Sequence, residues 1–265
     1  MKLLNVKHPA TDRVPIVISF PHSGTAIPEE LKNQYNPDAL AHLDDTDWFL
    51  PELYSFALDM GITMVEAQLS RWVIDLNRNP ESQPLYNDGR LITGLCTTTD
   101  FEGNAIYKEG CEPTQEEINR RLKLYYLPYY QKIQVLLNDL KEDFGHALLY
   151  DAHSIRSVVT TIQPQRFPDI ILGTVDETSA PKNIIEATMN GLKSSDYQVA
   201  HNSPFKGGHI TRFFGKPEEN QYALQVERCK DLYMDKLERA YDAEKGKKMR
   251  QMLIQTFSNL INEMK

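Results

Sequence analysis

The stretch VPIVISFPHSG, residues 14–24, is the part of the sequence that sets the expected fold. Its first seven residues form a nearly continuous apolar run rich in β-branched side chains, which is typical of a strand buried on both faces of a sheet. The run ends at a proline, and His22 follows. The same pattern recurs in HALLYDAHS, where apolar residues 147–150 lead into Asp151 and His153. The two stretches predict two buried strands with a histidine at each carboxyl end.

The rest of the sequence predicts further strands and helices. Short apolar runs typical of strands lie at 62–67, 72–76, 169–174, 198–200 and 222–227. Helical patterns lie at 48–60, 114–143, 180–195 and 246–264. This alternation predicts an α/β fold in which residues 1–265 form a single domain, with a central mixed, mostly parallel sheet flanked by helices.

Local signals mark the expected helix starts. Pro51 fits the first turn of one helix. Thr114 and Glu117 have the spacing of a capping box, and Pro128 is expected to bend or split the long helix that they begin. Residues 80–113, rich in Gly, Thr, Asn and Pro, are expected to form a long ordered excursion, and loops of that length are usually functional.

Composition limits the function classes. Apolar residues make up 41% of the 265 residues, and no apolar run approaches the ~20 residues that a membrane-spanning helix needs. The first 15 residues lack the apolar core of a secretory signal, so a cytoplasmic location is expected. A net charge of -8 without a basic cluster disfavours nucleic acid and anionic membranes as partners. Three widely spaced cysteines argue against a disulfide framework, and the sequence carries no signal for an oligomeric state.

The two histidines suggest a metal site. Both His22 and His153 are expected at the carboxyl edge of the sheet, where ligands collect in open α/β folds. The segment HLDDTDWF offers Asp44, Asp45 and Asp47 as a third ligand. Two imidazoles and one carboxylate with an open position are a catalytic zinc ligand set. The alternative is that the histidines are structural and that the aspartates cap a helix.

Charged residues near the same edge supply further candidates. Glu227 ends the strand 222–227 and can act as a general base, or it can be a solvated strand end. Arg71 and Arg78 can each grip a carboxylate through two parallel hydrogen bonds, although Asp75 can equally neutralise Arg78. A third arginine, Arg212, lies on a Gly-rich segment that can approach a ligand closely.

With these residues assembled, the sequence resembles the N-formylglutamate amidohydrolase family, whose members are also called N-formylglutamate deformylases. The matching blocks run through nearly the whole chain: PHSG at 21–24, DTDW at 45–48, SRWVIDLNRNP at 70–80, LITGLCTTTDFEGNAIY at 91–107, DAHSIRS at 151–157, DIILGT at 169–174, FKGGHITRFFG at 205–215 and ALQVERCKDLYMD at 223–235. The resemblance implies a zinc-carboxypeptidase-like α/β fold with a metal at the sheet edge.

The resemblance also implies a ligand set. Relatives with this fold often carry two metal ligands as HxxE, but the third residue after His22 is Thr25, so the carboxylate must come from elsewhere. We expect zinc on His22, Asp45 and His153, with Asp47 as the runner-up for the carboxylate. Iron, manganese or cobalt would also suit such a site.

Roles for the remaining residues follow from the resemblance. Arg78 of the DLNR motif is expected to be a catalytic arginine that binds or orients an anionic group and can stabilise the oxyanion, with Asn77 as its partner. Arg71, Arg212 and His209 are further candidates for substrate binding.

The implied reaction is hydrolysis of N-formyl-L-glutamate, a small anionic N-acyl amino acid, in histidine degradation, with Glu227 as the base. The alternatives are a deacylase for another N-acyl amino acid or peptide fragment, and a non-enzymatic metabolite-binding module.

Overall fold

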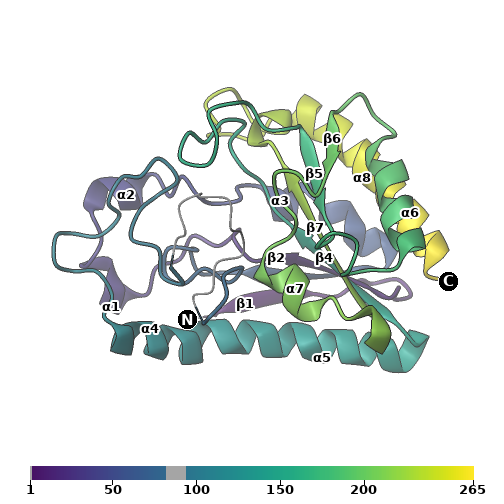
Figure 1. Ribbon diagram of the computed structural model, residues 1–265, viewed down its shortest axis with the longest axis horizontal. Helices are drawn as coiled ribbons and strands as arrows, with labels where there is room; N and C mark the ends of the chain where they lie inside the picture. Colours follow the sequence, from purple (N-terminus) through teal and green to yellow (C-terminus); the bar gives the residue numbers. More distant parts are fainter. Residues whose placement is uncertain (1, 82–93) are drawn as a thin grey trace.

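A seven-stranded sheet forms the centre of the computed structural model, which describes residues 2–81 and 94–265 (Figure 1). The strands lie in the order β1-β3-β2-β4-β7-β5-β6. Their bounds are β1 Leu4–Lys7, β2 Ile16–Phe20, β3 Thr63–Ala67, β4 Ala147–Ala152, β5 Ile170–Gly173, β6 Val199–His201 and β7 Gln221–Arg228.

Four neighbouring strands of this sheet run in the same direction. β3, β2, β4 and β7 are parallel to one another, whereas β1 is antiparallel to β3 and β5 is antiparallel to β7. β6 is parallel to β5. The predicted α/β fold with a mixed, mostly parallel sheet is therefore confirmed, and the carboxyl ends of four strands meet at one edge.

Helices cover both faces of the sheet. Figure 1 shows α6 and α8 side by side over one face, while α5 and α7 lie on the other. The α-helices are α1 Glu29–Lys32, α2 Pro37–Ala41, α3 Leu50–Leu53, α4 Gln115–Arg121, α5 Leu127–Phe144, α6 Lys182–Leu192, α7 His209–Phe214 and α8 Ala243–Glu263. Shorter turns are the 3-10 segments η1 Ser55–Met60, η3 Pro217–Glu219 and η4 Lys230–Leu232, and the π-helical segment η2 Leu122–Tyr126. Within the described ranges no helix is both long and apolar enough to cross a membrane.

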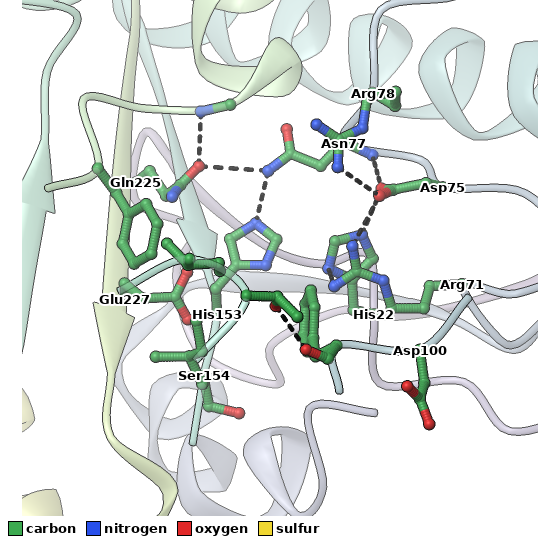
Figure 2. A pocket seen from close by; sticks show the side chains of 16 residues that line it. His22, Arg71, Asp75, Asn77, Arg78, Asp100, His153, Ser154, Gln225 and Glu227 are labelled. Carbon is green, nitrogen blue, oxygen red and sulfur yellow. Dashed lines mark hydrogen bonds and ion pairs between the residues drawn. The ribbon is translucent and has the colours of Figure 1, made fainter. Parts of the chain in front are cut away.

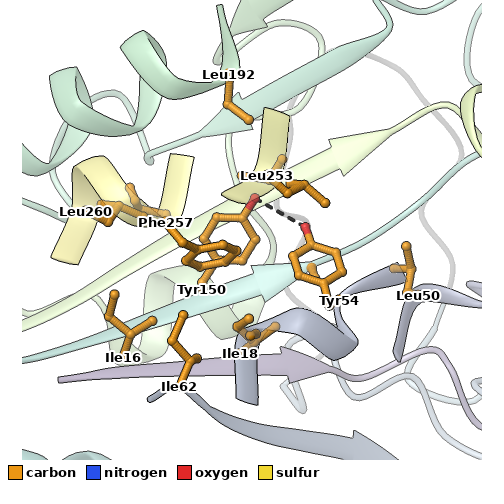
Figure 3. Packing of buried hydrophobic residues seen from close by; sticks show 14 of the residues in the cluster. Ile16, Ile18, Leu50, Tyr54, Ile62, Tyr150, Leu192, Leu253, Phe257 and Leu260 are labelled. Atoms are coloured by element: carbon orange, nitrogen blue, oxygen red, sulfur yellow. Dashed lines mark hydrogen bonds between the residues drawn. The ribbon is translucent and has the colours of Figure 1, made fainter. Parts of the chain in front are cut away.

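The core is divided by the sheet because strand side chains alternate between its faces. Ile16 and Ile18 of β2 pack on the α8 side, whereas Val17 packs on the α5 side. Figure 3 shows the side chains packed on the α8 side of the sheet, where Tyr150 of β4 packs on Phe257 of α8 with ring centroids 4.8 Å apart. Both faces of β2 and β4 are buried, which explains their continuous apolar runs.

The prediction of a strand at 72–76 is wrong. Residues 72–76 form turns, although their side chains are buried as the apolar run suggested. β3 ends at Ala67, and β1 and β2 already occupy both of its sides. β1, at Leu4–Lys7, was not predicted because its apolar patch is very short.

The predicted helices form with shifted bounds. The helix expected at 48–60 is divided into α3, with Pro51 in its first turn, and the 3-10 segment η1. The Thr114 cap is confirmed, since its hydroxyl accepts a hydrogen bond from the Glu117 backbone N–H at 3.3 Å. The long helix is interrupted just before Pro128, where the π-helical η2 separates α4 from α5. The excursion expected at 80–113 lies partly outside the described residues.

Candidate active site

The strands of the parallel set end at residues that the sequence singled out. His22 lies two residues after β2, His153 directly follows β4, and Glu227 is the penultimate residue of β7. The chain leaving β3 brings residues 71–78 to the same edge. All of these segments line one pocket, where Figure 2 shows the His22 and His153 rings next to each other and Glu227 beyond His153. The apolar part of its wall is formed by Phe101, Ile155, Ile162 and Phe205.

Two imidazoles and one carboxylate converge at the floor of the pocket. Nδ1 of His153 lies 3.2 Å from Oδ2 of Asp47, and Nδ1 of His22 lies 3.9 Å from the same oxygen. One donor atom from each residue lies within 4.8 Å of the others, and all three residues are buried. The backbone N–H of Asp47 donates to the His22 carbonyl at 2.9 Å, which holds this carboxylate beside the histidine.

The opposite nitrogens of both rings face carboxylates. Nε2 of His22 donates to Asp75 at 2.8 Å, and Nε2 of His153 donates to Asp151 at 2.8 Å. Asp151 is itself fixed by the Ser19 hydroxyl, which donates to it at 3.0 Å. Hydrogen bonds of this kind fix the ring orientation and leave the Nδ1 lone pairs available to an ion.

The charges of this group suit a divalent cation. Burial, and then the nearby Arg71 charge, lower the pKa of His22, so its ring is neutral at pH 7. Burial opposes charge on His153 as well, but the Asp151 and Asp47 carboxylates outweigh it and raise its pKa well above the usual value. A proton and a metal ion therefore compete for the Nδ1 of His153. His22, Asp47 and His153 match the three-residue set of a catalytic zinc site.

Asp45 has a different place from the one predicted. Its carboxylate accepts hydrogen bonds from the Trp72 indole at 2.8 Å and from the Phe101 backbone N–H at 3.1 Å. Burial raises the pKa of Asp45. The structure thus brings Asp47, and not the favoured Asp45, together with the two histidines, because Asp45 turns toward a structural pair of donors.

Glu227 lies in the pocket without a counter-ion in direct contact among residues 2–81 and 94–265. Its side chain is 9% exposed, and Oε1 has no hydrogen-bond partner within the described part of the chain. Burial raises the pKa of this carboxyl to about 7, against the lowering effect of the positive His153. A carboxyl group with a pKa near neutrality can both take up and release a proton at pH 7.

Asp75 organises the positive side of the pocket. It accepts from Arg71 at 2.7 Å and from Arg78 at 3.5 Å, in addition to His22. Although burial opposes ionisation, the Arg71 charge and the hydrogen bond from His22 hold the pKa of Asp75 well below its usual range. Arg71 also lies 3.4 Å from Nδ1 of His22 and stacks over the Phe101 ring at 4.7 Å. Asp75 therefore pairs with Arg78, as the sequence allowed, and it also binds Arg71 and His22.

Asn77 joins this side to β7 and to the start of α7. Its Nδ2 donates to Gln225 at 3.2 Å and lies 3.0 Å from Nε2 of His153, while its Oδ1 accepts from the Ile210 backbone N–H at 2.8 Å. A Cβ atom at Gly208 would lie 2.3 Å from the Asn77 side chain. Any larger residue at this position would therefore displace the Asn77 amide.

The chain is similar in sequence to known proteins. The sequence model of the N-formylglutamate amidohydrolase family matches residues 14–234. The chain belongs to this family. An N-formylglutamate deformylase from Pseudomonas putida is 40% identical over 85% of this chain and 84% of its own length. One from Pseudomonas aeruginosa is 41% identical over 84% of this chain and 83% of its own length.

A solved structure supports the fold. The crystal structure of an N-formylglutamate amidohydrolase from Ralstonia eutropha superposes with a TM-score of 0.82, covering 100% of this chain and 98% of that one at 23% identity. At that identity the likeness shows the fold alone. The resemblance of this sequence to the N-formylglutamate amidohydrolase family is confirmed by the family model and by the two deformylases.

Arg212 and His209, which were predicted to bind the substrate, are not among the described residues that line the pocket. Both belong to α7, where Arg212 donates to the Gly207 carbonyl at 3.2 Å and the His209 ring packs beside Tyr130 at 5.9 Å. Burial, and then the Arg212 charge, lower the pKa of His209 to about 4.

Sequence reasoning missed the roles of Asp151 and Gln225. Gln225 accepts from Gly208 N at 2.7 Å and from Asn77. Residues two apart on a strand point to the same face. The DxH spacing of Asp151 and His153, and the QxE spacing of Gln225 and Glu227, would have revealed both.

Proposed function

We propose that this protein hydrolyses N-formyl-L-glutamate to formate and L-glutamate with one divalent metal ion, zinc in the first instance. The observation that carries the proposal is the buried Glu227 carboxyl beside the group of His22, Asp47 and His153, with one oxygen that no described residue binds. The names of the two Pseudomonas relatives support this substrate. The reaction would be a late step of one route of histidine degradation.

Three residues would bind the metal ion. His22 and His153 would bind it through Nδ1 and Asp47 through a carboxylate oxygen. When bound, it supplies Lewis acidity to the formyl carbonyl and lowers the pKa of a water molecule. Asp75 and Asp151 keep the two rings oriented for binding by holding their Nε2 protons.

Glu227 would move the protons of the reaction. In its ionised form it takes a proton from the attacking water, and in its protonated form it delivers that proton to the glutamate nitrogen as the C–N bond breaks. Both forms are accessible because the pKa of Glu227 is raised to about 7. General acid–base catalysis of this kind contributes typically ~10²–10⁴-fold to a rate.

The arginines would neutralise the dianionic substrate. Arg71 lies beside the metal group, next to His22, where its charge can stabilise negative charge that develops on the formyl oxygen. Arg78 lies on the other side of Asp75 and would pair with the side-chain carboxylate of the substrate. These two positive charges line the pocket of a protein of net charge -8, where Asp75 already offsets one of them.

The Arg78→Ala variant is expected to lose kcat/KM for N-formyl-L-glutamate by about 10- to 150-fold, the range for a hydrogen bond to a charged group. The loss should be smaller for an N-formyl amino acid without a side-chain carboxylate. Steady-state kinetics on both substrates measure this, with Arg166→Ala as the control. Arg166 is an exposed arginine paired with Asp169 and Asp231. Equal losses on the two substrates would show that Arg78 does not bind the side-chain carboxylate.

Formate release from N-formyl-L-glutamate tests the function itself. The enzyme is assayed as purified, after treatment with a chelator, and after zinc is restored. We expect turnover that the chelator abolishes and zinc recovers. A zinc-loaded protein that releases no formate would exclude the proposed substrate, and a panel of other N-acyl amino acids would then identify the acyl group. Turnover that survives complete metal removal would exclude the metal-dependent mechanism.

A further inference from the structure

The segment 72–78, which carries the DLNR motif, runs through the interior without being part of the sheet. A strand at this position would have its carbonyl groups paired with neighbouring strands. Here they lack such partners, and a buried carbonyl group without a hydrogen bond is costly. Backbone N–H groups satisfy two of them, since Arg78 N donates to Asp75 O at 3.2 Å and His209 N donates to Asn77 O at 3.3 Å, and side chains from elsewhere in the chain bind others.

Three of these carbonyl groups are bound by one helical run. Arg121 at the end of α4 donates to the Val73 carbonyl at 3.1 Å. Tyr130 in α5 donates to Leu76 O at 2.8 Å, and Tyr126 in η2 donates to Arg78 O at 2.9 Å. The three donor residues are 0%, 6% and 2% exposed, so water does not replace these bonds.

The π-helical segment η2 puts the three donors on one side. In a π turn each N–H bonds to the carbonyl five residues back, as the Leu127 N–H does to Leu122 O. Arg121 and Tyr126, five apart across this turn, thereby share a side, as Tyr126 and Tyr130, four apart, share one in an α-helix. The two tyrosine rings stack with centroids 4.3 Å apart and 13° between their planes. Stacking fixes the direction of both hydroxyl groups.

The two tyrosines bind the carbonyl groups of the two residues that flank Asn77 in the chain. The Leu76 carbonyl accepts a hydrogen bond from the Tyr130 hydroxyl, and the Arg78 carbonyl accepts one from the Tyr126 hydroxyl. The hydrogen bonds that these hydroxyl groups donate to the described part of the loop go to backbone carbonyls, and neither tyrosine lines the described pocket. Their influence on a ligand must pass through Asn77 and Arg78.

We propose that Tyr126 and Tyr130 are positioning residues that hold Asn77 and Arg78 in the orientation that binds the anionic group of the substrate. The proposal rests on the proposed function for its kinetic consequence. Its structural part, that the two hydroxyl groups restrain the loop, stands apart from that function. The two parts are tested by separate measurements.

The kinetic test uses Tyr126→Phe and Tyr130→Phe, which keep the rings and remove only the hydroxyl groups. Each is expected to raise the KM for N-formyl-L-glutamate about ten-fold, with kcat within about three-fold of the wild type and zinc affinity unchanged, because a misplaced Arg78 weakens substrate binding. Tyr125→Phe is the matched control. Its hydroxyl donates to Glu30 at 3.3 Å, away from the loop. Its KM should equal that of the wild type.

A double-mutant cycle separates positioning from general destabilisation. If Tyr126 acts through Arg78, Tyr126→Phe should have no further effect on KM in the Arg78→Ala background. A purely structural role would instead lower the melting temperature, zinc occupancy and kcat together, and its effect would add to that of Arg78→Ala. The additive result would overturn the proposal.

Hydrogen–deuterium exchange tests the restraint without any substrate. The Asn77 and Arg78 amides are protected by bonds to Asp75, at 2.9 and 3.2 Å. In Tyr126→Phe and Tyr130→Phe, but not in Tyr125→Phe, exchange of these amides should be at least about ten-fold faster. Unchanged exchange in both variants would refute the proposal. Faster exchange in a protein whose wild type releases no formate would keep the restraint and reject the proposed function.

Discussion

Replacing Glu227 with Gln is expected to lower kcat by about two to four orders of magnitude while the fold and the bound metal are retained. Gln is nearly isosteric with Glu but cannot carry the proton. The Oε1 atom of Glu227 makes no hydrogen bond within the described residues, so the substitution breaks no contact of that oxygen. It also removes a carboxyl group whose burial is unfavourable when it is charged, and thermal stability should not fall.

The pH profile assigns the loss to the carboxyl group. Burial raises the pKa of Glu227 to about 7, so its basic form accumulates as the pH rises through that value. The wild type should therefore show a kcat/KM that rises with pH along a limb centred at or below pH ~7, since a nearby cation lowers a carboxyl pKa. That limb should be absent in Glu227→Gln. Zinc content measured at each pH is the control, and near-normal turnover by the variant would remove Glu227 from the proposed role.

The second large effect is expected at Asp47. Asp47→Ala should weaken zinc binding by more than ~100-fold, because even the outer partners of metal ligands are worth about 10- to 100-fold in affinity. Activity at limiting zinc should be lost with it. The reason is geometric, since Asp47 contributes the oxygen that faces Nδ1 of both His22 and His153.

Asp45→Asn is the matched comparison for Asp47→Ala. Asp45 is equally buried but binds Trp72 and Phe101, so this variant should keep one zinc per chain and lose some thermal stability instead. Zinc stoichiometry, chelator competition and melting temperature are measured on both proteins. Stoichiometric, tight zinc in Asp47→Ala together with its loss in Asp45→Asn would restore Asp45 as the ligand.

Local signals predicted most of the fold. Continuous apolar runs identified β2 and β4 because both strands are buried on two faces, and the Thr114 cap marked the start of α4. The same signal failed at 72–76. An apolar run reports burial, but it does not report whether a neighbouring strand is available for pairing. That depends on β1 and β2, which already occupy both sides of β3.

The sequence by itself determined that His22, His153 and Glu227 stand at strand ends, since each follows or ends an apolar run and parallel strands deliver their carboxyl ends to one edge. Only the tertiary structure decided between Asp45 and Asp47. The two residues are two positions apart in the same short segment and carry the same local signal. Their directions are set by partners distant in sequence, Trp72 for Asp45 and His153 for Asp47, and such contacts exist only after the chain has folded.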